Sequence, residues 1–288
     1  MNSDKIIAVF GATGTQGNAV AKQLLQEGWR VRAIARDATT AKAQALAELG
    51  AELVTADFDD FASLVKALEN AYGVYSVQPA LTTAGDVGQA RWGIAVADAA
   101  WTTQVQHFIY ASAVIDRAKG LVGLGSKRAI EERIAELSLP ATILRPVFFM
   151  ENLTTYFPVR LEADQLSLSI PFPLDRKLQM VSVIDIAKVA ASAFSKPQTY
   201  LGQAIEIVGD AITMDEMATA WSNATGRKCS ATSIPLNALA QVWSQGVPLF
   251  RFIGEGGCDV DFAATSKDAA MLSFSEWLRH SGAVNAGG

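Results

Sequence analysis

The sequence predicts an α/β protein whose N-terminal half is a doubly wound parallel sheet. Short apolar runs alternate with helical segments through this half of the chain. The runs lack the polar–apolar alternation of a half-exposed strand, as expected of parallel strands that are buried on both faces. A glycine-rich turn joins the first run to the first helix. Together these observations favour a repeated strand–helix unit.

The first unit comprises a strand over 6–10, a turn over 11–17, a helix over about 18–27 and a strand over 31–35. Its turn is Gly-x-x-Gly-x-x-Gly, and glycine brings backbone N–H groups close to a ligand without an intervening Cβ. The dipole of the following helix favours an anion there. This context predicts a dinucleotide diphosphate site. Its residues are Gly11, Thr13, Gly14, Thr15, Gln16 and Gly17. Alternatively, the glycines only allow close packing of helix against strand.

Arg36 refines the prediction of the ligand, because it ends the second strand, beside the expected position of the adenosine ribose. An acidic residue there would accept hydrogen bonds from the 2′-hydroxyl, whereas an arginine suits a 2′-phosphate. We therefore expect NADP(H) rather than NAD(H), although Asp37 follows directly. The alternative is an exposed arginine at a strand end.

The middle of this half continues the alternation. Its elements are a helix over 40–49, a strand over 52–56, a helix over 61–70, a strand over 73–77 and a long helix ending near 101. Asp57 and Phe58 follow the third strand, where Asp57 would accept from the adenine amine and Phe58 would cover the ring. Alternatively, Asp57 caps the next helix. Val77, Gln78 and Pro79 lie at the carboxyl end of the fourth strand, where ligands bind, and should line the nicotinamide side.

Two more strands are expected over 106–112 and 140–146, with a helix over 126–137 between them. Ser126 is a suitable N-cap for this helix. His107 lies at the entrance of its strand, away from the expected cleft. We therefore interpret it as structural, and Ser-His-Asp catalysis is poorly supported.

The second half is less regular. A helix ends near 195, a strand covers 204–208, and Thr213 and Glu216 have the spacing of a capping box. We expect Asp185 to cap its helix. The predicted domains are a nucleotide-binding domain over 1–152, with 181–209 packing back onto it, and a substrate or partner lobe over 153–180 and 210–288.

Composition bounds the function classes. The chain has 288 residues, of which 50% are hydrophobic, and a formal net charge of -5. This charge does not suggest a nucleic-acid partner. Cys229 and Cys258 have no zinc-site or disulfide spacing. The first strand begins almost at Met1, and no apolar run spans a bilayer, so we expect a cytoplasmic protein without a membrane partner.

Several motifs together resemble the NmrA-like branch of the atypical short-chain dehydrogenases/reductases. The motifs are residues 11–17, 36–37, 56–60, Ser126-Lys127 with Glu131, 144–152, 202–209, Thr213 and 224–227. The resemblance implies a Rossmann domain, a smaller and mostly helical C-terminal lobe, and NADP(H) bound between them. Some members reduce quinones, dyes or other small carbonyl or conjugated compounds, whereas others are regulators that sense the NADP(H) state.

The resemblance also locates the chemistry. Most short-chain dehydrogenases use Tyr-x-x-x-Lys, and Lys127 fits the lysine, but Gly123 stands in place of the tyrosine. Lys127 would itself polarise an oxygen, as in isoflavone-reductase-like relatives, or it is a solvated lysine at a helix start. Ser112 matches the catalytic Ser or Thr position and would bind a substrate oxygen, or it caps a turn. Tyr110 and Tyr156 are the possible substitute proton donors.

The segment after the sixth strand completes the expected site. The backbone groups of Pro146, Val147 and Phe148 should border the nicotinamide carboxamide. Residues 148–150 form a possible apolar substrate wall, of which at most one side chain is expected to touch ligand.

Two hypotheses follow. The first is an NADPH-dependent reductase of a small apolar, aromatic or quinone-like molecule. The second is a non-catalytic NADP(H) sensor with a regulatory protein partner, which the missing tyrosine favours. Lys127, Ser112 and the aromatic cluster favour the reductase, which we adopt.

Overall fold

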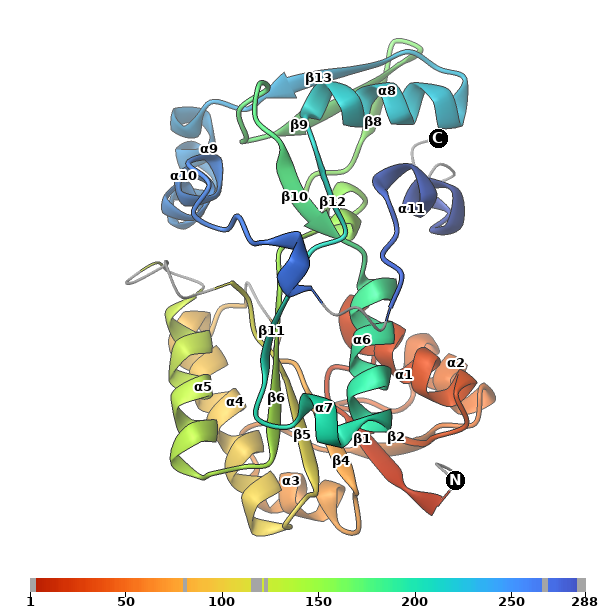
Figure 1. Ribbon diagram of the computed structural model, residues 1–288, viewed down its shortest axis with the longest axis vertical. Helices are drawn as coiled ribbons and strands as arrows, with labels where there is room; N and C mark the ends of the chain where they lie inside the picture. The colour runs from red at the N-terminus through yellow and green to blue at the C-terminus, as the bar shows by residue number, and fades with distance from the viewer. Residues whose placement is uncertain (1–3, 80–81, 115–120, 122–123, 266–268, 284–288) are drawn as a thin grey trace.

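The protein is built around one seven-stranded sheet, shown in the lower part of Figure 1. The computed structural model describes residues 4–79, 82–114, 121, 124–265 and 269–283. The strand order is β11-β6-β5-β4-β1-β2-β3, and every neighbouring pair is parallel. This is the doubly wound order with a seventh strand added beyond the sixth. The predicted fold class is therefore confirmed.

The elements of this unit follow the predicted alternation. Its strands are β1 (Ile6–Val9), β2 (Arg30–Ala35), β3 (Glu52–Thr55), β4 (Gly73–Ser76), β5 (His107–Ala111), β6 (Ala141–Pro146) and β11 (Ala204–Ile207). Its helices are α1 (Thr15–Gln26), α2 (Ala41–Glu48), α3 (Phe61–Leu68), α4 (Gly85–Thr102), α5 (Gly125–Glu136), α6 (Val183–Ser195) and α7 (Pro197–Tyr200).

Helices cover both faces of the sheet, which explains the apolar runs without alternation. Ile7 and Val9 pack with α1, α2 and α6 in one core cluster. Ala8 and Phe10 pack with α3, α4 and α5 in another. Since successive side chains of a strand point to opposite faces, residues 7–10 enter the two cores alternately.

The remaining elements form what we call the second lobe, in the upper part of Figure 1. Its strands are β7 (Phe148–Phe149), β8 (Arg160–Glu162), β9 (Gln165–Ile170), β10 (Leu178–Val181), β12 (Asp210–Ile212) and β13 (Cys229–Ser233). Its helices are α8 (Met214–Thr225), α9 (Leu236–Trp243), α10 (Val247–Gly254) and α11 (Phe274–His280), with 3-10 turns η2 (Met150–Leu153), η3 (Ser244–Gly246) and η4 (Phe262–Ala264).

The strands of the second lobe form two sheets of three strands, β12-β10-β7 and β13-β9-β8. The sequence analysis did not identify these sheets, because most of their strands have only two to five residues. Together with the helices they enclose a separate core that contains Trp221, Phe250 and Trp277. The lobe therefore has a hydrophobic centre of its own.

Two helix-cap predictions have different outcomes. The capping box of Thr213 and Glu216 is formed at α8, which ends at Gly226 with φ 71°. The expectation for Asp185 is wrong, because Ser182 caps α6. The buried carboxylate of Asp185 instead accepts hydrogen bonds from the backbone N–H of Leu272 at 2.8 Å and from Lys188 at 2.9 Å. It thereby fixes the segment before α11 against α6.

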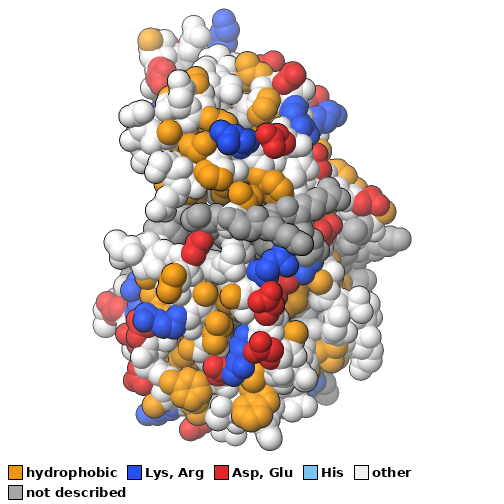
Figure 2. Space-filling model, turned by 90° about the vertical axis from the view of Figure 1, so that its left-hand side faces the viewer, with side chains coloured by type: hydrophobic (Ala, Val, Ile, Leu, Met, Phe, Trp, Pro, Cys, Tyr) orange, Lys and Arg blue, Asp and Glu red, His pale blue; other side chains and the backbone are white. Residues whose placement is uncertain are grey.

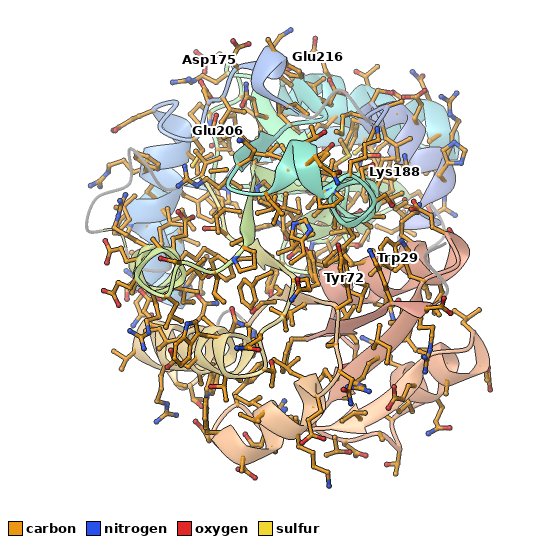
Figure 3. The ribbon with its side chains drawn as sticks, turned by 60° about the horizontal axis from the view of Figure 1, so that its bottom comes forward. Trp29, Tyr72, Asp175, Lys188, Glu206 and Glu216 are labelled. Carbon is orange, nitrogen blue, oxygen red and sulfur yellow. The ribbon has the colours of Figure 1, made fainter. Side chains whose placement is uncertain are left out.

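Aromatic contacts close the end of the sheet opposite the glycine-rich turn. The rings of Trp29 and Tyr72 stack at 6.2 Å, and Trp29 also contacts Phe194 of α6 (Figure 3). His107 is fully buried there, with Nε2 2.8 Å from the Thr142 hydroxyl. Burial lowers the pKa of His107 to about 4. Its position and neutral state fit the structural interpretation.

Charged side chains of both signs are interspersed on the face drawn in Figure 2. The described surface of that face shows no continuous basic patch. Of the described helices, none combines the length and apolar content needed to cross a bilayer.

Candidate functional site

A cavity of about 620 Å³ lies beyond the carboxyl ends of the central strands. Residues that directly follow β1, β2, β4, β5 and β6 line one side of it. The second lobe supplies the other side. Open parallel sheets bind ligands at this edge, where the direction of the connections reverses.

The glycine-rich turn forms the floor of this cavity, and two of its glycines are required by close approach. Gly11 has φ +66°, and a Cβ there would lie 2.7 Å from the side chain of Val77. At Gly17 a Cβ would lie 2.2 Å from the carbonyl oxygen of Gly11. The turn is also closed by a hydrogen bond of 2.8 Å from the Gly14 N–H to that carbonyl. No side chain fits at these points without moving the backbone.

The helix after this turn begins earlier than predicted, at Thr15 instead of about Asn18. Gly14 is extended and serves as the N-cap, so the first helical turn contains Thr15, Gln16 and Gly17. Their backbone N–H groups have no partner within the helix. All three residues line the cavity. The helix start therefore presents donors directly to a bound anion.

Gln16 offers a buried hydrogen-bond donor to the cavity. Its side chain is buried and lines the cavity, but its Nε2 has no hydrogen-bond partner among the described residues. A buried donor without a partner is costly. A phosphate or ribose oxygen at this place would satisfy it, together with the hydroxyl-bearing Thr13 of the same wall.

Arg36 also lines the cavity, from the end of β2. Its guanidinium is exposed and has no hydrogen bond or ion pair within the described ranges. Asp37 is engaged elsewhere, because its carboxylate accepts from the N–H of Thr39 at 2.8 Å and from its hydroxyl at 2.6 Å. These bonds lower the pKa of Asp37. No ion pair joins this neighbouring acid to Arg36 within the described ranges.

Of Asp57 and Phe58, which lie shortly after β3, only Phe58 lines the cavity. Phe58 lines the cavity, with its ring 5.8 Å from Phe10 and 5.8 Å from Trp92. Asp57 is not among the lining residues and accepts from the N–H of Asp59 at 3.0 Å. The alternative that Asp57 caps α3 is wrong, since Asp60 does so. A hydrogen bond from Asp57 to adenine stays a prediction.

The end of β4 reaches the cavity as expected, through Val77, Gln78 and Pro79. Pro79 is linked to α5 by a buried chain of hydrogen bonds that the sequence did not reveal. Gln89 donates to the Pro79 carbonyl at 3.2 Å and accepts from the Ser126 hydroxyl at 2.7 Å. The prediction that Ser126 is the N-cap of α5 is therefore wrong. The helix begins at Gly125, and the Ser126 side chain is buried.

Lys127 lies in the first turn of α5 and lines the cavity. Its Nζ donates to the carbonyl of Ala111 at 3.2 Å and lies 5.8 Å from the ring centre of Tyr110. Burial lowers the pKa of Lys127 to about 8, although the charge of Glu131 acts in the opposite direction. The interpretation as a solvated surface lysine does not fit this environment. Gly123 lies outside the described residues.

Ser112 follows Ala111 directly and also lines the cavity. Its hydroxyl donates to Oε1 of Glu131 at 2.5 Å. Glu131 in turn pairs with Arg145, whose Nη2 lies 2.6 Å from Oε2 and whose Nε lies 3.2 Å from Oε1. Ser112 thus belongs to a charged network and does not cap a turn. The sequence motif contained Glu131, but no role was predicted for it.

Pro146 at the end of β6, Val147 and Phe148 line the cavity, and their predicted place beside the nicotinamide carboxamide stays a prediction. Phe149 lines it as well, whereas Met150 is fully buried in the core of the second lobe. Two of the three residues of the expected apolar wall therefore border the cavity, and the expectation that at most one of them touches ligand stays a prediction. The two side chains pack against different cores, Phe148 against that of the second lobe and Phe149 against that of α1, α2 and α6.

The two tyrosines considered as proton donors are placed differently. Tyr110 is fully buried in the sheet, does not line the cavity, and its hydroxyl has no partner among the described residues. Burial raises the pKa of Tyr110 well above its usual value. Tyr156 lines the cavity but is 59% exposed, so it lies at the rim.

The second lobe contributes further lining residues that the sequence analysis missed. They include Phe172, Leu178, Leu249, Ile253, Cys258 and Asp259. They come from separate segments, and no local pattern marks them. Glu151 also lines the cavity and joins the two parts of the molecule. It accepts hydrogen bonds from Ser182 and Trp277, each at 2.9 Å, and burial raises its pKa.

Among the described residues, no group of three or more histidine, cysteine or acidic side chains is arranged to hold a metal ion. Fold and site together define a dinucleotide-binding α/β protein with Rossmann topology. A family model described as the NmrA-like family matches residues 3–278. The chain therefore belongs to the NmrA-like family.

Individual relatives agree with this assignment. The chain is 28% identical over 276 residues to an NmrA-like family domain-containing oxidoreductase, hkm9, of Aspergillus hancockii, covering 85% of this chain and 79% of that protein. It is 28% identical over 246 residues to an NAD(P)H azoreductase of Xenophilus azovorans, covering 84% and 82%. The NADPH-dependent quinone oxidoreductase QOR2 of Escherichia coli has the same fold, with a TM-score of 0.77 at 24% identity, covering 96% and 98%.

Proposed function

We propose that the protein is an NADPH-dependent oxidoreductase that transfers hydride to a small, apolar conjugated acceptor such as a quinone. The observation that carries the proposal is the position of Lys127. This lysine, whose pKa is lowered, lines the same cavity as the glycine-rich turn and the aromatic side chains of Phe148, Phe149 and Phe172. The similarity to an oxidoreductase and to an NAD(P)H azoreductase supports this class of reaction.

The residues at the cavity floor fit NADP(H). The close packing of Gly17 against the Gly11 carbonyl leaves space above the turn for a diphosphate. Gln16 offers a buried donor without a partner among the described residues, and the exposed guanidinium of Arg36 suits a 2′-phosphate. Phe58 supplies a ring face for adenine. Such a cofactor, when bound, supplies the hydride.

Lys127 then acts as the proton donor in place of the missing tyrosine. When hydride adds to a conjugated carbonyl, negative charge develops on the oxygen, and the ammonium of Lys127 stabilises it and transfers a proton. Solvent restores the proton to the amine. Because only the ammonium form can donate, kcat should be highest below pH 8 and should fall as the pH rises through the Lys127 pKa of about 8.

The test is NADPH oxidation by the purified protein against a panel of quinones and conjugated carbonyls. Lys127→Ala should lower kcat by about 10²–10⁴-fold and abolish the fall above pH 8, because one proton donor is lost. The matched control is Lys66→Ala on α3, which lies outside the cavity and should keep full activity. Titration of NADPH must show that the Lys127 variant still binds the cofactor. Unchanged turnover in this variant would contradict the assigned role.

The sensor hypothesis keeps one specific observation in its favour, the glycine at position 123 where dehydrogenases carry tyrosine. Tight binding of NADPH or NADP without turnover of any acceptor would favour it, above all if the two forms differ in affinity. Failure to bind either form would contradict both hypotheses.

A further inference from the structure

The hydrogen-bond polarity of Ser112 is set by residues behind it. The hydroxyl has one hydrogen, and that hydrogen points to Oε1 of Glu131. Glu131 cannot reverse this bond, because both of its oxygens accept from the guanidinium of Arg145. With both oxygens accepting from the guanidinium, the carboxyl group of Glu131 has no hydrogen directed at Ser112. The lone pairs of Ser112 therefore remain as its only free hydrogen-bonding capacity.

Lys127 has the opposite polarity and contacts the residue that precedes Ser112. One N–H of its ammonium is used by the carbonyl of Ala111, which precedes Ser112 in the chain. No second acceptor for Lys127 occurs among the described residues, and an ammonium carries three donors. Both side chains line the same cavity. The cavity wall therefore carries a donor, Lys127, bound to the residue that precedes the acceptor Ser112.

We propose that the Ser112 hydroxyl can only accept a hydrogen bond from a substrate. The site would therefore select substrates that carry an N–H or O–H donor next to the carbonyl that Lys127 polarises. Glu131 and Arg145 are the positioning residues that impose this direction. This inference rests on the proposed reductase function and narrows its substrate class. An ordinary serine with a free hydrogen would bind carbonyl oxygens without such a preference.

A near-isosteric pair of ligands tests the inference. We would measure the dissociation constants of 2-amino-1,4-naphthoquinone and 2-methyl-1,4-naphthoquinone by equilibrium dialysis against the protein saturated with NADP, so that no turnover occurs. The wild-type protein should bind the amino compound about threefold to tenfold more tightly, the effect of one additional hydrogen bond. Ser112→Ala should bind the two with equal affinity or favour the methyl compound.

Glu131→Gln distinguishes positioning from general structural support. Its amide can donate to Ser112 and release the serine hydrogen toward the cavity, so the preference for the amino compound should disappear while both quinones still bind. The matched control is Glu136→Gln on the same helix, which also pairs with an arginine but is exposed and lies outside the cavity. It should keep the wild-type preference.

The outcomes separate this inference from the function on which it rests. Equal affinities in the wild-type protein, or an unchanged preference in Ser112→Ala, would overturn the role of Ser112 and leave the reductase intact. Weaker NADP binding by Ser112→Ala with equal quinone affinities would assign Ser112 to the cofactor and overturn the substrate preference. If neither quinone binds and no acceptor is reduced, both proposals fail. Should Ser112→Ala not fold, the wild-type comparison alone decides.

Discussion

The two walls of the cavity are built in different ways. The wall of the seven-stranded sheet uses short segments after successive strands, and its central part is one continuous segment, residues 11–17, that includes the start of α1. The wall of the second lobe draws single side chains from η2, β10, α10 and the segment after α10. The shape of the sheet wall is set mainly by the path of the backbone. The shape of the second-lobe wall is set by the side chains that project into the cavity.

This difference determines how each wall responds to substitution. A wall made of backbone loses its shape when a side chain is added, because the new atoms collide with closely packed backbone and force it to shift. A side-chain wall loses contacts gradually as its members are shortened. The following substitutions test the contrast in order of expected effect.

The largest effect is expected for Gly17→Ala. The new Cβ would lie 2.2 Å from the carbonyl oxygen of Gly11, so the turn must shift and the helix N–H groups lose their positions. We expect the dissociation constant of NADPH to rise on the order of 100-fold, which corresponds to a loss of about 2.7 kcal/mol. Calorimetric titration measures it. Gly125→Ala is the control, because its Cβ meets nothing within 4 Å and its NADPH affinity should be unchanged.

An intermediate effect is expected for Arg36→Ala. Loss of a charge-assisted hydrogen bond to the 2′-phosphate should weaken NADPH binding by about tenfold and leave NADH binding nearly unchanged. Parallel titrations of the two cofactors measure this ratio. Arg30→Ala removes an exposed arginine from the opposite end of β2 and should not alter it. An equal loss of affinity for both cofactors would contradict the role of Arg36 in discrimination.

The smallest effect is expected for Ile253→Ala in the second lobe. Shortening this partly buried side chain should raise the KM for an apolar acceptor by about fivefold, from the loss of about 1 kcal/mol of apolar contact. NADPH affinity should stay the same. Val242→Ala on α9 is the control, since that side chain is 84% exposed. A large loss of NADPH affinity in Ile253→Ala would show that the two walls are not separable.

The same contrast explains what the sequence could predict. The glycine-rich turn and the strands around it have local signatures, since a buried parallel strand and a helix start each involve neighbouring residues. Arg36 and Ser112 could be placed at the cavity because they follow strands that end beside it, whereas Lys127 was found only through the family resemblance. The predicted boundary at Asn18 was late, because a glycine in the first turn of a helix resembles the end of a turn.

The parts that were missed depend on contacts between distant segments. Gln89 and Ser126 are joined by a buried hydrogen bond between α4 and α5, and nothing near either residue indicates that contact. Glu131 was visible only as part of a motif, and its position between Ser112 and Arg145 emerges from the folding of α5 onto β5 and β6. Leu249 and Ile253 read as ordinary apolar residues of a short helix.

The last strand of the main sheet has a consequence for how the chain is made. On the ribosome, β1 to β6 emerge in order and can pair as they appear, but β11 follows only after much of the second lobe has been synthesised. Until Ala204–Ile207 emerge, the outer edge of β6 has unpaired N–H and C=O groups. Such an open edge can pair with another nascent chain. The interval between synthesis of β6 and β11 is therefore a period in which this edge is open to aggregation.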